Sequence, residues 1–159
     1  MKHLFLVRHG DYNREDGDLS FYGMNQIEKL AKEMKSIVGD CKDYYIISSL
    51  AVRAQRSAQI IAKEFNVPTF DRVRELWPLE DDDLTYEEMR KIDNLIEPHK
   101  EKEVVTLATH YEVLESYPTY LVEKLFGKKL YNIPEVRKGE GVHLDLEKKT
   151  YQMIPRRGL

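Results

Sequence analysis

The chain has 159 residues, of which 42% are hydrophobic and 33% are charged, and its formal net charge at pH 7 is −3. This length fits one domain, so we expect a single domain over residues 1–159. The composition excludes a disordered tail, and no apolar run is long enough to cross a bilayer. The acidic balance argues against a general nucleic-acid-binding surface. With a single cysteine and no expected signal peptide, we expect a cytoplasmic protein without an internal disulfide.

The first half of the chain alternates short apolar runs, typical of strands, with periodic segments that are typical of helices. Ser20 is the predicted N-cap of the first helix, and Gly39 is its predicted C-terminal stop. In chain order, we expect a strand over residues 2–7, a helix over 24–37, a strand over 44–47, a helix over 51–65 and an edge strand over 68–73.

The second half continues the alternation, with a surface helix over residues 84–96 and a buried strand over 104–108. Pro118 interrupts the next helical pattern, so either the helix kinks there or a separate helix begins with this proline in its first turn. Residues 141–146 and 150–154 alternate in polarity and predict a final hairpin. Together these elements predict an α/β fold, a three-layer α/β/α sandwich with a mostly parallel central sheet.

Polar and reactive side chains follow three of the predicted strands. Open α/β sheets bind ligands at the carboxyl ends of their strands, so we expect these groups to converge. Two arginines and two histidines in one place indicate an anion site, and arginine forks suit phosphate especially well. A helix N-terminus near residue 50 adds positive potential. The groups are Arg8 and His9 after the first strand, Ser48, Ser49 and Arg53 after the second, and Thr109 and His110 after the strand over 104–108.

These residues carry a resemblance to the histidine phosphatase superfamily, also called phosphoglycerate mutase-like. Leu6-Val7-Arg8-His9-Gly10 resembles its Arg-His-Gly signature, which here follows an N-terminal strand. The resemblance runs from the first strand to the final hairpin. Its other elements are Leu19-Ser20 with Gly23 and Gln26, residues 49–54 with Ser57-Ala58, residues 71–76, and residues 104–110.

The resemblance implies a role for each residue of the site. His9 would attack phosphorus and become a phosphohistidine, since neutral imidazole is a good nucleophile that also leaves easily. Arg8 and Arg53 would hold the non-bridging oxygens, where the transition state gathers charge. His110 would donate a hydrogen bond to the phosphoryl group, best when protonated in the field of the phosphate. Glu75 would be the general acid that protonates the departing alkoxide.

Two of these assignments have structural alternatives. Arg56 follows Arg53 by three residues and would serve equally as surface charge, although the Arg-Ala dipeptide and the distance from Ser49 favour Arg53. The alternative for Glu75 is a surface ion pair with Arg72 or Arg74.

The sequence departs from the family pattern beside the second histidine and in two loops. Tyr111-Glu112 follows that histidine, where the family has a small residue, and would narrow the pocket or select its substrates. Glu15 stands where the family commonly has an asparagine, and Asn13 is the phosphate-binding candidate in its place. Trp77-Pro78 and the acidic run at residues 80–83 replace the usual continuation of the acid loop.

Three functions remain open from the sequence. The first is a metal-independent phosphatase that hydrolyses a phosphorylated small molecule through a phosphohistidine, without a cofactor, nucleic acid or membrane partner. The second is a protein phosphohistidine phosphatase, because a phosphoramidate needs less help from a general acid. The third is a non-catalytic phosphate-binding module, which the departures beside His110 and in the acid loop suggest. We expect no metal site, and the sequence leaves the oligomeric state and the physiological substrate open.

Overall fold

A computed structural model describes residues 1–78, 83–130 and 134–156. Its strands are β1 (His3–Arg8), β2 (Tyr44–Ser49), β3 (Asp71–Val73), β4 (Val104–Thr109), β5 (Gly141–Asp145) and β6 (Thr150–Ile154). Its α-helices are α1 (Phe21–Val38), α2 (Val52–Glu64), α3 (Tyr86–Ile96) and α4 (Tyr111–Phe126). Two short 3₁₀ helices, η1 (Arg74–Leu76) and η2 (Glu97–His99), complete the described elements. Strands and helices alternate as the sequence pattern predicts.

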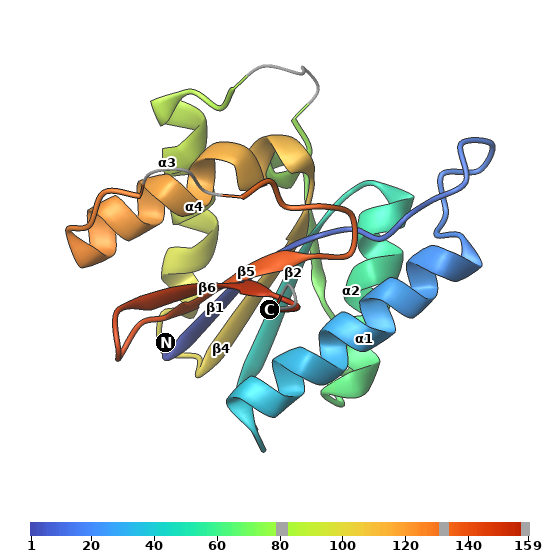
Figure 1. Cartoon of the computed structure of the whole chain (residues 1–159), viewed down its shortest axis with the longest axis horizontal. Helices are drawn as coiled ribbons and strands as arrows, with labels where there is room; N and C mark the ends of the chain where they lie inside the picture. The colour runs from blue at the N-terminus through green and yellow to red at the C-terminus, as the bar shows by residue number, and fades with distance from the viewer. Residues whose placement is uncertain (79–82, 131–133, 157–159) are drawn as a thin grey trace.

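The six strands form one sheet in the order β3-β2-β4-β1-β5-β6 (Figure 1). The four strands β1 to β4 are all parallel to one another. The last two strands are antiparallel to their neighbours, since β5 pairs with β1 and β6 pairs with β5. The mostly parallel sheet and the final hairpin are therefore confirmed. Because β4 lies between β2 and β1, the carboxyl ends of these three strands meet at one edge of the sheet.

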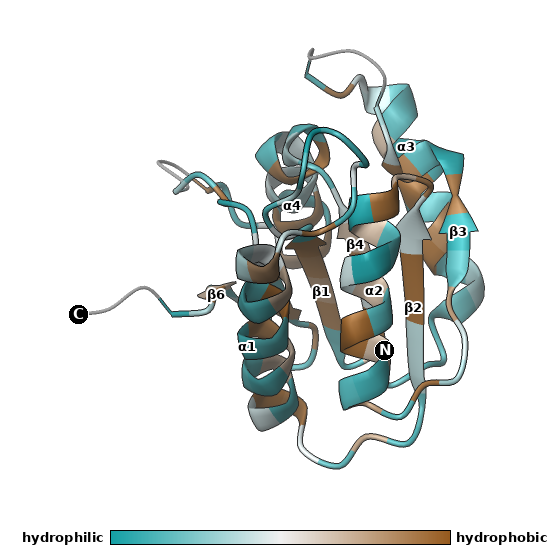
Figure 2. Cartoon of the chain, turned by 90° about the vertical axis from the view of Figure 1, so that its right-hand side faces the viewer, coloured by the Kyte–Doolittle hydropathy of each residue, from teal (hydrophilic) through white to brown (hydrophobic). Residues whose placement is uncertain are grey.

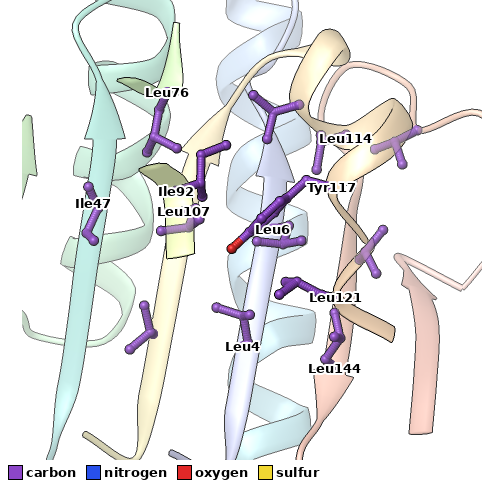
Figure 3. Packing of buried hydrophobic residues seen from close by; sticks show 14 of the residues in the cluster. Leu4, Leu6, Ile47, Leu76, Ile92, Leu107, Leu114, Tyr117, Leu121 and Leu144 are labelled. Atoms are coloured by element: carbon purple, nitrogen blue, oxygen red, sulfur yellow. The ribbon is translucent and has the colours of Figure 1, made fainter. Parts of the chain in front are cut away.

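Helices cover the sheet on both faces and make three layers. Strand β1 is buried on both sides, so its residues are apolar without alternation, as expected for a parallel strand inside an α/β fold. Phe5 packs toward α1 and α2 with Ile27 and Leu30. In Figure 2, β1 is largely brown behind the hydrophilic outer sides of α1 and α2. On the other face, Leu6 packs in the cluster that Figure 3 shows, with Leu114, Tyr117 and Leu121 of α4.

Local signals in the sequence set the ends of the first helix. The Ser20 hydroxyl accepts a hydrogen bond of 3.0 Å from the Gly23 backbone N–H, which satisfies one of the orphan donors of the first turn. Gly39 ends α1 with φ at 67°, a conformation that glycine adopts without a steric penalty. The predicted N-cap and C-terminal stop are confirmed.

The proline in α4 neither ends the helix nor starts a new one. Pro118 lies inside a continuous helix and is buried. Val113, Leu114, Leu121 and Val122 are buried on both sides of it along the chain, so one apolar stripe packs against the sheet across the proline. This packing outweighs the loss of one helical hydrogen bond at Pro118.

Candidate active site

His9 lies directly after β1, and its backbone is hydrogen-bonded on both sides. Its backbone N–H donates to the Thr109 carbonyl at 3.2 Å, and the Gly139 N–H donates to the His9 carbonyl at 3.0 Å. The side chain is 4% exposed. Nδ1 lies 2.8 Å from the Gly10 carbonyl oxygen, which can only accept, so Nδ1 carries the proton. The other ring nitrogen, Nε2, is therefore the unprotonated one.

The unprotonated nitrogen of His9 faces an arginine. Arg53 Nε donates to His9 Nε2 at 3.2 Å. Burial, together with the charges of Arg53, Arg8 and Lys138, lowers the pKa of His9 to about 3, against the raising effect of its bond to Gly10. The imidazole is thus neutral at pH 7, which is the nucleophilic form.

The second histidine, His110, lies beside the first at the end of β4. The two ring centroids are 5.1 Å apart, and His110 Nε2 is 2.7 Å from the Ser49 hydroxyl at the end of β2. Burial, followed by the charges of His9, Arg53 and Arg8, lowers the pKa of His110 to about 3. In the free protein this low pKa favours the neutral form of His110, whereas the resemblance implies a protonated donor in the field of a bound phosphate, which stays a prediction. An anion in the site opposes this shift, because it stabilises the charged imidazolium.

Arg53, rather than Arg56, reaches the nucleophile. It belongs to the first turn of α2, with its guanidinium carbon 4.5 Å from the centroid of the Tyr12 ring and 5.7 Å from that of Trp77. Arg56 forms an ion pair with Asp18 at 3.0 Å, where it holds the loop that precedes α1. This separation agrees with the preference of the sequence pattern for Arg53.

Arg8 is the last residue of β1, directly before His9, and only some of its side-chain N–H groups have hydrogen-bond partners among the described residues. Nη1 donates to the Val136 carbonyl at 3.1 Å, and the guanidinium carbon lies 5.3 Å from the centroid of the Tyr111 ring. Nε is buried and has no hydrogen-bond partner among the described residues. A buried unpaired donor is costly, so the group suits a bound anion.

Two helices begin at this edge of the sheet without a capping side chain. Ala51 is the N-cap of α2 and His110 is the N-cap of α4, and neither makes a side-chain capping bond. The orphan backbone N–H groups of both first turns add partial positive charge to that of the arginines. The electrostatic character of the edge is that of an anion site.

Close backbone packing holds the Gly10 turn against α1. A Cβ atom on Gly10 would lie 2.6 Å from the Gly23 carbonyl oxygen, and one on Gly23 would lie 1.9 Å from that of Asp11. The Gly10 N–H donates to the Ser57 hydroxyl at 3.2 Å, and the Asp11 N–H donates to Gln26 Oε1 at 2.8 Å. The small residues and polar partners of the family-like motifs therefore position the turn that carries His9.

Glu75 is exposed on η1, and no contact among the described residues joins its carboxylate to His9. It forms no ion pair with Arg72 or Arg74 there either, and Arg72 donates instead to Gln55. The 3₁₀ helix itself is anchored near the site, because Thr109 Oγ1 donates to the Leu76 carbonyl at 2.7 Å. The role of Glu75 as the general acid stays a prediction.

Asn13 is the predicted phosphate-binding residue of the loop before α1, and that role stays a prediction. Its side chain is exposed on the loop between β1 and α1, which projects from the body of the domain (Figure 1). Its backbone N–H donates to the Asp18 carbonyl at 2.9 Å.

The other departures from the family pattern lie beside His110 and in the acidic run. Tyr111 faces Arg8 as described, and Glu112 is in the first turn of α4. Residues 80–82 of the acidic run lie outside the described residues.

Three side chains that sequence reasoning did not assign belong to the site. Trp77 stacks on His110 with 5.8 Å between ring centroids, and Tyr12 meets His9 edge-on at 5.4 Å. Lys138 lies 5.0 Å from the centroid of the Tyr12 ring. The only signals for Trp77 were its place after Glu75 and its being the single tryptophan, while Lys138 follows no motif.

The structure also bears on metal-binding and membrane-spanning classes of protein. Among the described residues, no group of three or more histidine, cysteine, aspartate or glutamate side chains is arranged to hold a metal ion. In the same part of the chain, none of the helices has the length and apolar character needed to span a membrane.

The comparison with protein families decides the class. The sequence profile of the histidine phosphatase superfamily (branch 1) matches residues 4–117, which include every histidine and arginine of the site. The chain belongs to this superfamily. The comparison with curated proteins gave no match. Membership of this family supports phosphatase activity.

Solved structures of this superfamily share the fold over the whole chain. Mycobacterial glucosyl-3-phosphoglycerate phosphatase, in complex with VO3, is 15% identical with a TM-score of 0.66, and 100% of both chains is covered. A candidate alpha-ribazole-5'-P phosphatase from Escherichia coli K-12 is 15% identical, with a TM-score of 0.65 over 99% of this chain and 98% of that one. A candidate phosphohistidine phosphatase, SixA, from Agrobacterium tumefaciens is 20% identical, with a TM-score of 0.61 over 99% and 98%. At these identities the likeness establishes the fold.

Proposed function

We propose that this protein is a metal-independent phosphatase that hydrolyses a phosphorylated small molecule through a phosphohistidine on His9. The observation that carries the proposal is the state of the His9 ring. Its Nδ1–H is engaged by the Gly10 carbonyl at 2.8 Å, and its Nε2 lone pair is directed to Arg53. A neutral, oriented imidazole beside two arginines combines a nucleophile with ligands for the phosphoryl oxygens.

In the first half of the reaction, His9 Nε2 attacks phosphorus and the P–O bond to the alcohol breaks. Arg53 then turns its N–H from His9 Nε2 to a phosphoryl oxygen, and the unpaired Nε–H of Arg8 provides another donor. The departing alkoxide takes a proton from Glu75, for which the exposed position on η1 requires the substrate to extend toward that helix.

In the second half, water attacks the phosphorus of the phosphohistidine and transfers a proton to the Glu75 carboxylate. The P–N bond breaks and its electron pair returns to His9 Nε2. Neutral His9 is regenerated, so the protein's own residues complete the cycle. The side chains supply both the nucleophile and the positive charge, and the proposed chemistry requires no metal ion.

The test is to trap the intermediate. Wild-type protein in excess EDTA should hydrolyse labelled phosphomonoesters, and a rapid alkaline quench should leave a base-stable, acid-labile phosphoryl group that mass spectrometry locates on His9. Loss of turnover in EDTA that returns with added metal, or a label found on another residue, would contradict the proposal.

A protein phosphohistidine phosphatase is the second candidate. The observation that favours it is a pair of exposed apolar side chains at the start of α2, just before Arg53 in the chain: Leu50 is 42% exposed and Val52 is 50% exposed. Exposed apolar side chains beside a reactive pocket suit a protein substrate. A panel that sets sugar and glycerate phosphates against a phosphorylated histidine domain separates the two candidates, and both agree with the predicted cytoplasmic location.

A further inference from the structure

Trp77 contacts two groups of the site, and the proposed reaction does not use it. Its ring is stacked on that of His110, with 5.8 Å between the centroids and 17° between the planes. The guanidinium carbon of Arg53 lies 5.7 Å from the centroid of the same ring. The face of an indole is the electron-rich side of its aromatic system, and it attracts a cation that lies over it. The single tryptophan of the chain thus presents this face to a histidine and an arginine of the site.

The backbone fixes Trp77 against His110. Trp77 directly follows η1, and its N–H donates to the Arg74 carbonyl at 3.0 Å. Leu76, the residue before it, is fully buried, and its carbonyl accepts from Thr109 Oγ1 at 2.7 Å. Because Thr109 directly precedes His110, one hydrogen bond joins the two residues that adjoin the stacked rings. The stack is therefore set by the fold of both segments.

The surroundings of His110 oppose a proton on its ring in the free protein. Burial is the largest cause of its low pKa of about 3, and nearby charges lower the pKa further. Glu112 belongs to the first turn of α4, yet among the described residues no acid contributes to this shift. The groups that face the ring are Arg8 and His9 at the end of β1, Arg53 of α2 and the neutral Ser49 hydroxyl of β2.

A dianion in the site changes this balance, because it stabilises an imidazolium beside it. A carboxylate partner for the imidazolium would repel the same anion, whereas an indole face stabilises a cation and carries no net charge. We propose that Trp77 is a positioning residue whose indole face stabilises the imidazolium form of His110 when an anion enters the site. The inference rests on the proposed function for the anion that occupies the site, and the binding of an inorganic anion tests it without turnover.

Two other roles for Trp77 make different predictions. If the ring only packs η1 against the sheet, its loss weakens anion binding by the same factor at every pH. If the ring instead supports the alcohol part of a substrate, its loss leaves the binding of an inorganic anion unchanged. A stabilised imidazolium predicts a loss that depends on pH, because proton uptake by His110 is then coupled to binding. The pH profile of binding is therefore the readout.

The probe is sulfate, which stays a dianion from pH 5 to pH 8, and its affinity is measured by calorimetry. At pH 5 the free His110 ring is neutral, and sulfate binding draws a proton onto it. Trp77→Leu should therefore bind sulfate about tenfold more weakly than wild type at pH 5, the value of a desolvated cation–π contact. At pH 8, where the ring stays neutral with sulfate bound, the loss should be less than about twofold.

Two further variants control this measurement. Trp77→Phe keeps an aromatic face with a weaker attraction for cations, so at pH 5 it should lose less than about threefold in affinity. It also keeps the test open if Trp77→Leu does not fold. Tyr86→Leu removes an aromatic ring that is 64% exposed on α3, and it should match wild type at both pH values.

The emission of Trp77 gives a second measurement that leaves this residue in place. An imidazolium quenches the fluorescence of a stacked indole more strongly than a neutral imidazole does. Sulfate should therefore quench the wild-type emission at pH 5 and leave it unchanged at pH 8. In His110→Gln the quenching at pH 5 should disappear, because no imidazolium can form beside the indole.

Several outcomes would overturn the role of Trp77. These are equal losses of affinity in Trp77→Leu at pH 5 and pH 8, no loss at either pH, unquenched wild-type emission with sulfate bound, and a wild type that binds no sulfate. The proposed function fails separately. If the wild type binds sulfate with the expected pH profile and hydrolyses no phosphate ester, the phosphatase proposal is wrong and the role of Trp77 stands.

Discussion

Two pairs of histidines lie at opposite ends of β1 and differ in what surrounds them. His9 and His110 follow the carboxyl ends of β1 and β4, with 5.1 Å between ring centroids. His3 and His143 lie where β1 begins, beside β5, and their centroids are also 5.1 Å apart. Burial lowers the pKa of all four rings. Spacing and burial therefore do not distinguish an active site from a structural pair.

The pair at the start of β1 forms a closed hydrogen-bond chain. Arg156 donates to Gln152 Oε1 at 3.2 Å, which turns the amide nitrogen of Gln152 toward His143 Nδ1 at 3.0 Å. His143 Nε2 must then carry the proton that His3 Nδ1 accepts at 2.9 Å. The acidic groups Asp145, Glu103 and Glu147 act on His3. Such an environment satisfies the rings and repels an anion.

The pair at the end of β1 has the opposite environment. Its rings do not share a hydrogen bond, since His9 faces Gly10 and Arg53 while His110 faces Ser49. Cations surround it, and two uncapped helix N-termini point to the same edge. The charge around a buried histidine, and the atoms left free on its ring, therefore decide whether it can do chemistry.

The largest expected effect separates the two pairs directly. His9→Ala should lower kcat by about a thousandfold or more, because it removes the covalent pathway itself. His3→Ala should change kcat less than about threefold. Steady-state hydrolysis of an aryl phosphate measures both, and calorimetry should show that His9→Ala still binds inorganic phosphate through its arginines. Undiminished turnover in His9→Ala contradicts the mechanism, and bound phosphate without turnover in the wild type favours a binding module.

The next largest effect is expected at the arginine beside the active pair of histidines, and not at the arginine beside the other pair. Arg53→Lys should lower kcat/KM by about a hundredfold, since a lysine cannot reproduce the guanidinium fork on a phosphoryl group. Arg156→Lys, beside the other pair, is the matched control and should stay within about threefold. A similar loss in both variants would mean that Arg53 acts through the fold, which urea denaturation of the two proteins would reveal.

A third effect is expected at Glu75, the proposed general acid for the reaction at His9. Glu75→Gln should slow alkyl phosphates by about a hundredfold and aryl phosphates least, because an acid matters in proportion to the basicity of the leaving group. A series of substrates with graded leaving-group pKa values measures this. A uniform loss along the series would leave Glu75 with only an electrostatic or structural part.

The smallest expected effect concerns the pair His3 and His143 and the stability of the fold at acidic pH. On folding, the pKa of His143 falls from 6.5 to about 4, so its unfolded form binds protons first. Its contribution to stability is complete above pH 6.5 and is lost as the pH falls toward 4. His143→Phe should therefore lose less unfolding free energy than wild type between pH 7 and pH 4.5, as urea denaturation measures, with unchanged kcat at pH 7. Parallel pH profiles of the two proteins would assign the acid sensitivity to other groups.

Much of this architecture follows from local patterns. The apolar runs of β1, β2 and β4 predict buried strands, and the parallel arrangement brings Arg8, His9, Arg53 and His110 to one edge. These inferences succeed because periodicity and capping act over a few residues, and because parallel strands share one direction. Loop residues are harder to place in this way: Asn13 is exposed on the loop between β1 and α1, and its phosphate-binding role stays a prediction.

The order of strands and helices, the resemblance to the superfamily, and the two arginines and two histidines at the strand ends can all be inferred from the sequence. The continuous course of α4 through Pro118, the neutral form of His110 in the free protein, and the place of Tyr12, Trp77 and Lys138 in the site come from the folded structure. These features depend on packing and on charges from segments that are distant in the chain, so no local pattern predicts them. Loop residues follow no period, so their neighbours are set by how the layers close and not by their spacing in the sequence.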